Sequence, residues 1–407
     1  MIGTILVLTI MLGVAAYQFL KGNIARATAT ILVVLFSSVI ALGYFELLAG
    51  LLADYVTSVA PWAQLICFSL IFLLCFALFQ TTVIALLKEP ISLGDLVEKI
   101  GRPLCGLILG WLISGVVLTA ASMAPIPNNY PYARFKDRNP DASKPAPVLL
   151  NADGFIVGWF NKVSQGSFKA IREPKSFALL HADFLNQTYL NRHALDKEVT
   201  LMTNSPAIVV PSKAATWPAP DGLVDKEGQP INSPAGQTPL LVRIGIKKAV
   251  RDAEKFTTSQ LRIICKDKGP DSHTLGGAGF TVYPYGYMVG PKTVEKKRLN
   301  EVINVGGQSG EGNVCNIDFL FFVPSHRVPV LAAFKLNNAV RLSPPVSADQ
   351  SPSVIAFITG GSSQKVEPPT PAPQEQSREG AAEQAGREPD LMDVTRGLVA
   401  DPTILQN

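Results

Sequence analysis

Four long apolar stretches occupy the first ~125 residues of the chain. Each approaches or exceeds the ~20 residues that an α-helix needs to cross ~30 Å of hydrocarbon. None carries an ionisable side chain in its middle, and soluble core helices are rarely this long or this poor in charge. We therefore predict a four-helix transmembrane domain over residues 1–125, with spans at Ile2–Leu20, Ala27–Phe45, Trp62–Leu87 and Leu104–Ala124.

Beyond the fourth stretch, residues 126–150 are rich in proline and asparagine. Proline lacks an amide donor and restricts the residue before it, so this segment is predicted to be an extended linker. Asp153 is then placed to cap a helix that runs through Phe155, Trp159 and Val163. We expect the aromatic edge of this helix to pack against its own domain, with the membrane surface as the alternative.

From residue 207 the pattern changes to short β-branched or aromatic runs, separated by Pro, Gly, Asn and Asp. Such runs are typical of a sandwich or barrel, and Lys247–Phe256 is predicted as a short helix between two of them. Residues 151–360 are therefore predicted to form a β-rich, sandwich-like α+β domain. The predicted strands are Ala207–Val210, Leu240–Ile246, Gln260–Cys265, Gly279–Tyr285, Ile317–Val323 and Val328–Phe334.

The last segment, residues 361–407, is dominated by Gly, Ser, Pro, Gln and Glu. This composition cannot bury a core, so a disordered acidic tail is expected. The predicted fold class is thus a multi-pass α-helical membrane domain with four transmembrane helices, followed by a β-rich extracytoplasmic domain and a disordered tail.

Charge divides the chain along the same boundaries. Residues 1–126 carry five basic and five acidic side chains, residues 127–360 carry 27 basic and 19 acidic ones, and residues 361–407 carry four and eight. A modest positive excess spread over a large domain is typical of a solvated surface. Because no basic platform interleaved with aromatic residues is present, we expect no nucleic-acid partner.

The loops between the predicted spans differ in positive charge. The segment Glu46–Pro61 has no Lys or Arg, whereas the first and third loops have five between them. Positive loops stay in the cytoplasm, which predicts that the N-terminus and everything after Ala124 are extracytoplasmic. Met1 is followed directly by Ile2-Gly-Thr, without the basic region of a cleavable signal peptide, so the first span is expected to remain. The basic loop residues are Lys21, Arg26, Lys88, Lys99 and Arg102.

Short motifs beside the spans carry a resemblance to a known family. Lys21-Gly22 with Arg26 leads into the second span, and Arg102 followed by Gly106 and Gly110 leads into the fourth. In this arrangement the chain resembles the colicin V production (CvpA-like) family of bacterial inner-membrane proteins over about 125 residues. The chain departs from the family at three places: Gly101 stands where an acidic residue precedes the Arg, Pro103 adds one residue before the first Gly, and Ala27 replaces an acidic residue.

The resemblance implies an inner-membrane protein that is linked to toxin production or export. It supplies no molecular activity. The lipid bilayer is the one partner that the spans themselves imply. A protein partner of the outer domain is expected but unidentified, and the sequence leaves open a homo-oligomer.

A stripe of small residues, Gly106, Gly110 and Ser114, repeats every four positions in the fourth span. Small residues let another helix approach closely, where packing replaces the hydrophobic drive that lipid removes. The stripe therefore predicts a helix-packing face. Since transporters place ionisable residues within the bilayer and these spans have none, a channel is only the third interpretation.

Two of the five cysteines, Cys265 and Cys315, lie in the predicted outer domain. In an oxidising compartment they can pair, and we favour a disulfide between them over two unpaired thiols. The other three lie in or beside spans and are expected to act as small hydrophobic residues.

One catalytic interpretation has to be considered. Some bacterial membrane proteases join a four-span bundle to an outer chymotrypsin-like domain. Gly307-Gln-Ser-Gly310 has the shape of their nucleophile loop, with Ser309 as nucleophile, His181 as base and Asp183 nearby. However, the string around His181, Ala-Leu-Leu-His-Ala-Asp, lacks the small residues and the strand end expected beside such a base. Ser309 is followed by Gly-Glu-Gly-Asn rather than by Gly-Pro. A glycine-rich turn explains the string better.

No other chemistry is predicted. The four histidines have no metal-ligand spacing with each other or with cysteine, and no phosphate-binding glycine motif is present. We therefore expect no metal, no cofactor and no catalytic residues. The sequence therefore favours a non-enzymatic membrane scaffold or export-associated protein with an outer binding domain, and a membrane-anchored serine protease is the alternative.

Overall fold

The computed structural model describes residues 2–357, apart from 89–93, 136–138, 167–175, 196, 198, 204, 271, 273 and 307–312. Contacts between residues divide the chain into two units, residues 1–362 and 363–407. The predicted tail, residues 361–407, lies outside the described residues, as does Ser309.

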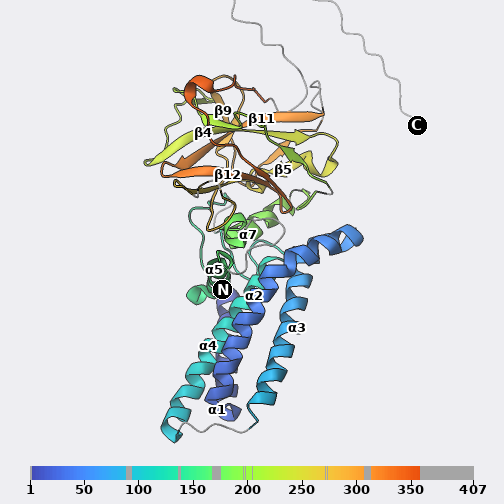
Figure 1. Cartoon of the computed structure of the whole chain (residues 1–407), viewed down its shortest axis with the longest axis vertical. Helices are drawn as coiled ribbons and strands as arrows, with labels where there is room; N and C mark the ends of the chain where they lie inside the picture. Colours follow the sequence, from blue (N-terminus) through green and yellow to red (C-terminus); the bar gives the residue numbers. More distant parts are fainter. Residues whose placement is uncertain are drawn as a thin grey trace, which may run out of the picture. The chain divides into compact units, whose positions relative to one another are not determined.

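Four helices of the first unit are long and apolar enough to cross a membrane. Figure 1 shows them in blue and cyan, running alongside one another. A 3₁₀ turn, η1, precedes the third. The helices are α1 (Ile2–Lys21), α2 (Ile24–Tyr55), η1 (Thr57–Trp62), α3 (Ala63–Leu86) and α4 (Asp95–Ser122).

Two of these helices extend well past the apolar stretches. Helix α2 begins after Asn23, whose side chain accepts the Ala25 N–H at 2.9 Å, and it continues to Tyr55, ten residues beyond the predicted end. Helix α4 begins at Asp95, nine residues before the predicted start. An acidic side chain at a helix N-terminus is favourable, and Asp95 provides one. The length of the apolar stretch therefore underestimated both helices.

The four helices pack on one another in a defined arrangement. Helix α1 packs on α4, and α2 packs on both α3 and α4. At the far end of the bundle, Arg26 at the start of α2 donates to the carbonyl of Leu87 at 2.8 Å, which satisfies an orphan carbonyl after α3. Gly3 at the start of α1 contacts Tyr132, which follows α4. The N-terminus thus lies on the same side of the bundle as the rest of the chain.

The segment after α4 is less extended than its prolines predict. Tyr132 and Val148 are buried in one small core with Leu118 of α4. Three further helices follow the linker, and sequence analysis predicted only the first of them. They are α5 (Ala152–Ser164), α6 (Phe177–Leu180) and α7 (Phe184–Leu195). Parts of the predicted linker are therefore packed, because their aromatic and aliphatic side chains are buried.

A β-rich region, residues 199–357, completes the described chain. One sheet has the strand order β1-β4-β11-β8-β9-β3, with β2 also paired to β4; a second has the order β13-β12-β6-β7; and β10 pairs with β5. The strands are β1 (Ile208–Val209), β2 (Thr216–Pro218), β3 (Val224–Asp225), β4 (Gln237–Lys247), β5 (Lys255–Thr257), β6 (Leu261–Asp267), β7 (Phe280–Val282), β8 (Gly286–Met288), β9 (Thr293–Lys296), β10 (Val302–Asn304), β11 (Val314–Pro324), β12 (Arg327–Phe334) and β13 (Asn338–Arg341).

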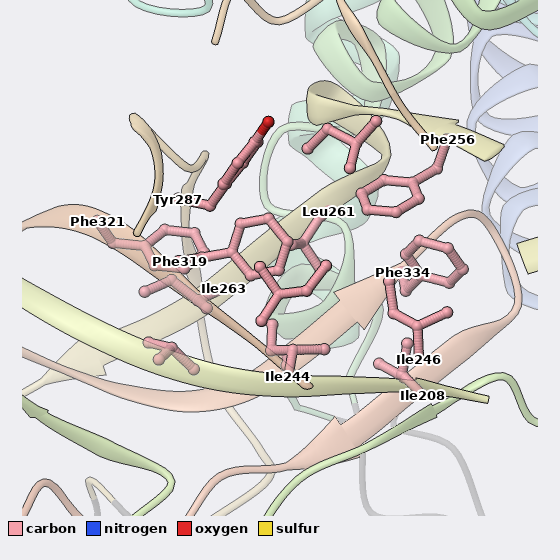
Figure 2. Packing of buried hydrophobic residues seen from close by; sticks show 14 of the residues in the cluster. Ile208, Ile244, Ile246, Phe256, Leu261, Ile263, Tyr287, Phe319, Phe321 and Phe334 are labelled. Carbon is pink, nitrogen blue, oxygen red and sulfur yellow. The ribbon is translucent and has the colours of Figure 1, made fainter. Parts of the chain in front are cut away.

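The two larger sheets share one hydrophobic core. Figure 2 shows side chains from β4 and β11 meeting those from β6 and β12, among them Ile244, Phe319, Ile263 and Phe334. Successive side chains of a strand point to opposite faces, so each long strand also serves a second core. Leu241 of β4 packs away from the shared core with Trp217, and Ile264 of β6 packs with Leu179 of α6.

The predicted strands lie where the sequence pattern put them, with one shortened. Within Gly279–Tyr285 only Phe280–Val282 is a strand, β7. Pro284, which has no amide to donate, follows it, and β8 begins beyond the predicted range at Gly286. The predicted helix Lys247–Phe256 was wrong. Its residues end β4, pass through a 3₁₀ turn at Arg251–Ala253 and begin β5. Cross-strand pairing of Lys247 with Val314 takes the place of a helical turn.

Candidate functional site

Helices α5 and α7 join the membrane helices to the β-rich region. Phe45 of α2, Phe160 of α5 and Phe184 of α7 belong to one buried cluster. The rings of Phe45 and Phe184 meet edge to face, with their centroids 5.9 Å apart. Gly115 of α4 lets the chain at Ala152 approach so closely that a Cβ would collide with the Ala152 carbonyl. The core therefore runs without interruption from the bundle into these junction helices.

Arg192 of α7 ties the junction to the end of α4. Its guanidinium donates to the carbonyls of Ala121 and Tyr130, and it lies 4.5 Å from the centroid of the Tyr189 ring. Burial lowers the pKa of Arg192, which is 3% exposed. A cation on the last carbonyls of a helix satisfies orphan acceptors and complements the helix dipole. The sequence pattern gave no sign of this contact.

A second polar group anchors the start of α5. The Tyr132 hydroxyl donates to the buried Asp153 carboxylate, and Arg134 donates to the Tyr132 oxygen at 3.2 Å. Burial, and then the Asp153 charge, raises the pKa of Tyr132, so this hydroxyl keeps its proton. The predicted capping role of Asp153 was wrong. Asn151 is the residue before the helix, and Asp153 accepts from Gly154 within the first turn.

A chain of polar side chains links α2 to strand β6. Glu46 Oε1 lies 2.8 Å from His181 Nε2, and the side chain of Gln187 lies between His181 Nδ1 and Arg262. Although Glu46 lies this close, His181 Nε2 has no partner in hydrogen-bond geometry, so the pair is a close polar contact rather than an aligned hydrogen bond. His181 is 2% exposed and lies against the rings of Phe177 and Phe184.

The orientation of Gln187 follows from its neighbours. A guanidinium only donates, so we assign the amide oxygen to the side of Arg262, at 2.7 and 3.1 Å from its terminal nitrogens. The amide nitrogen then donates to His181 Nδ1 at 2.9 Å. This leaves the proton of the neutral imidazole on Nε2, which faces Glu46. We call Glu46, His181, Gln187 and Arg262 the polar chain.

Strand geometry explains why a charged residue sits here. In β6 the side chains of Leu261, Ile263 and Cys265 enter the core between the sheets. Arg262 alternates with them and, like Ile264, faces the junction helices. A lone arginine inside an apolar strand is the sequence signal for this site. The alternation of side chains along the strand determines which face of the sheet the arginine points to.

Two of the hollows in the described part of the chain border the residues of the polar chain or Asp183. The junction cavity has a volume of 410 Å³ and is lined by both ends of the polar chain, Glu46 and Arg262, together with Gly50, Gln64 and Asn337. The strand-edge cavity has a volume of 730 Å³ and lies along β7, where Asp183 accepts from the hydroxyls of Thr281 and Tyr283 at 2.8 and 2.5 Å. Burial, followed by the Asp183 charge, raises the pKa of Tyr283 well above its ordinary value.

The residues of the protease alternative are engaged elsewhere or fall outside the described chain. The His181 imidazole contacts Glu46 and Gln187, and the Asp183 carboxylate contacts Thr281 and Tyr283. Asp183 is thus not the partner that orients His181. Ser309 lies outside the described residues.

The cysteine prediction does not match the structure. Cys265 and Cys315 are both buried and free. They lie on strands of different sheets, β6 and β11, where each contributes to the shared core. Burial raises the pKa of the Cys265 thiol to about 12, so it is a poor thiolate at neutral pH. An oxidising compartment was an insufficient reason to expect a bond, because strand register sets where each thiol lies.

The small-residue stripe of α4 faces α1 at its first two positions. A Cβ on Gly106 would lie 2.7 Å from Ala15 Cα, and one on Gly110 would lie 2.6 Å from Met11 Cα. Ser114 is buried and donates to the Gly110 carbonyl at 2.7 Å within its own helix. The glycines are therefore at a close backbone contact, and the serine hydroxyl is satisfied locally.

Among the described residues, no group of three or more His, Cys, Asp or Glu side chains could hold a metal ion. Comparison of the chain with protein-family models, curated proteins and solved structures found no match. Function therefore has to be argued from the junction and the two cavities.

Proposed function

We propose that this chain is a non-catalytic membrane scaffold that holds a sandwich-like binding region fixed at the bilayer surface. The observation that carries this proposal is the continuous core from α2 and α4 into α5 and α7, closed by Arg192 on the Ala121 carbonyl at the end of α4. A domain that only needed an anchor could hang from a flexible linker. Here buried contacts fix it instead.

The cellular setting belongs to the same proposal. The loop charges support an orientation with the N-terminus and the β-rich region extracytoplasmic. The resemblance to the colicin V production family supports the bacterial cytoplasmic membrane and a role in toxin production or export. A homo-oligomer is compatible with it, since α1 and α3 are only 11% and 17% buried over their apolar windows.

The strand-edge cavity is the surface that we assign to the partner. Its 730 Å³ falls within the range of ligand sites, and its lining combines aromatic rings with a few polar groups. Phe280 is 40% exposed at this cavity. A photo-crosslinking amino acid at Phe280 should give a discrete adduct in cells, whereas the same group at Trp159, also 40% exposed but on α5, should not. Equal adducts at both positions would contradict a specific binding cavity.

The enzyme alternative has its own test. A fluorophosphonate probe labels a serine that a base activates. We expect no labelling of the full-length protein in membranes, because His181 is held by Glu46 and Gln187. Labelling that disappears in Ser309→Ala would replace the scaffold with a serine hydrolase.

A further inference from the structure

We propose that the junction cavity binds the headgroup of an ethanolamine phospholipid, with the phosphodiester toward Arg262 and the primary ammonium toward Glu46. The cavity lies between the end of α2, the start of α3 and strand β6. Its 410 Å³ is within the size range of small-molecule sites. Lipid binding here is separate from partner binding, because the strand-edge cavity is a different hollow with different walls.

Arg262 provides the anion-binding half of the site. Its side chain is 2% exposed, and the acceptors around it are neutral: the Lys335 carbonyl at 3.3 Å and the Gln187 amide. Its Nε has no hydrogen-bond partner, and no carboxylate of a described residue forms an ion pair with it. A buried charge without a counter-ion is costly, and a guanidinium pairs well with a phosphate.

Glu46 provides the other half. Its side chain is 40% exposed and lines the same cavity, and the ion-pair contact of its carboxylate within the described part of the chain is with the His181 ring. A simple anion drawn to Arg262 would be repelled by this carboxylate. A ligand that carries an anionic and a cationic group together satisfies both walls. An ammonium with three N–H donors can also hydrogen-bond the carboxylate, which a trimethylated ammonium cannot.

The surroundings favour a lipid over a free metabolite. Apolar side chains supply much of the remaining lining, including Ala49, Leu180 and Met202. On the same end of α2, Leu47 and Leu51 are 64% and 49% exposed, so acyl chains have an apolar surface to follow. Tyr44 and Trp62 are exposed at this level, as expected at the interface between hydrocarbon and water.

Gly50 offers a clean way to block the cavity. It lies in α2 and lines the cavity, and a Cβ added there meets nothing within 4 Å. Gly50→Leu should therefore fill the hollow without straining the helix. Gly158 of α5 is the matched control, because it is also a helical glycine with open space around its Cβ, and it does not line the cavity.

The test uses full-length protein and native mass spectrometry with added phosphatidylethanolamine, phosphatidylcholine or phosphatidylglycerol. We expect phosphatidylethanolamine to bind about tenfold more tightly than the other two, since each lacks one charge-assisted contact. Gly50→Leu should lose this preference, Gly158→Leu should keep it, and Glu46→Gln should make phosphatidylethanolamine and phosphatidylglycerol equivalent.

Three results would overturn the proposal. Equal binding of the three lipids by the native protein would remove the headgroup specificity. Retention of the preference in Gly50→Leu would place the lipid elsewhere. If free phosphoethanolamine displaced phosphatidylethanolamine when both are present at equal concentration, the cavity would be a site for a soluble ligand instead.

Discussion

Single side chains at the junction were the hardest features to predict. His181 was considered only as a catalytic base, because its contact Glu46 lies far away in the sequence and in a different element. In the sequence, Glu46 is only the first residue of the loop predicted between the second and third spans. Arg262 was visible as a charge within an apolar strand, but its neighbour Gln187 comes from a helix that no periodicity revealed. Tertiary contacts, rather than local pattern, decide what these residues do.

The contact between Glu46 and His181 can be measured by a double-mutant cycle. We expect Glu46→Gln and His181→Asn to be non-additive by about 1 kcal/mol in the free energy of unfolding, since the residues touch at 2.8 Å. The measurement is denaturant unfolding of the full chain in detergent, with each single variant and the double variant. Strict additivity would show that the contact is absent in solution.

Lys335 makes stability depend on pH in a defined window. Its ammonium donates to Thr200 Oγ1 at 2.7 Å and to the Lys255 carbonyl at 3.1 Å, and burial lowers its pKa from 10.5 to about 8. The unfolded chain therefore holds this proton to higher pH than the folded chain. The free energy of unfolding should rise between pH 8 and 10.5 and be unaffected by this group below pH 8.

Lys335→Met provides the comparison, because it keeps the length of the side chain and removes the titration. The native chain should gain up to about 3 kcal/mol relative to this variant between the two pH limits. Denaturant midpoints at pH 7, 8, 9 and 10 measure the difference. Parallel curves for the two proteins would mean that Lys335 keeps its ordinary pKa in the folded state.

Elements were predictable wherever one period dominated. The apolar stretches located all four membrane helices, and alternation located the long strands of both sheets. Ends were less predictable. Helix α4 begins in polar sequence, where the acidic first-turn residues Asp95 and Glu98 matter more than hydropathy. Helix α2 continues past Glu46 through a further apolar segment to Tyr55. Strands of two to four residues, such as β3 and β10, have too few positions to show alternation. Such short strands are formed by their hydrogen bonds to a neighbouring strand, which the local sequence does not contain.

The contact of α1 with α4 should depend on Gly110. Gly110→Leu places a side chain where Met11 Cα lies 2.6 Å from the Cβ position, so the two helices must separate and lose packing. Gly13→Leu is the matched control, since a Cβ on this glycine of α1 meets nothing within 4 Å. The melting temperature in detergent should fall for Gly110→Leu alone. Equal melting temperatures for both variants would mean that this face of α4 is not packed.

At the scale of the whole molecule, composition predicted a membrane part and a β-rich part, but not how they are joined. The linker prolines suggested an extended segment. Instead, the Tyr132 hydroxyl donates to Asp153 of α5. Arg192 of α7 donates to the Ala121 carbonyl at the end of α4. These contacts involve single polar side chains far apart in the sequence, so no window of local sequence contains them.

The most direct test of the account measures whether the β-rich region is fixed to the membrane helices. One spin label is placed at Leu12, an exposed position of α1, and a second at Glu227, an exposed position of the β-rich region. Pulsed electron paramagnetic resonance in nanodiscs then measures the distance between the two labels. We predict one narrow distance distribution for the native chain, which broadens in Arg192→Ala because the cap on α4 is lost. A broad distribution in the native chain would contradict the account, since it would describe a domain on a flexible tether.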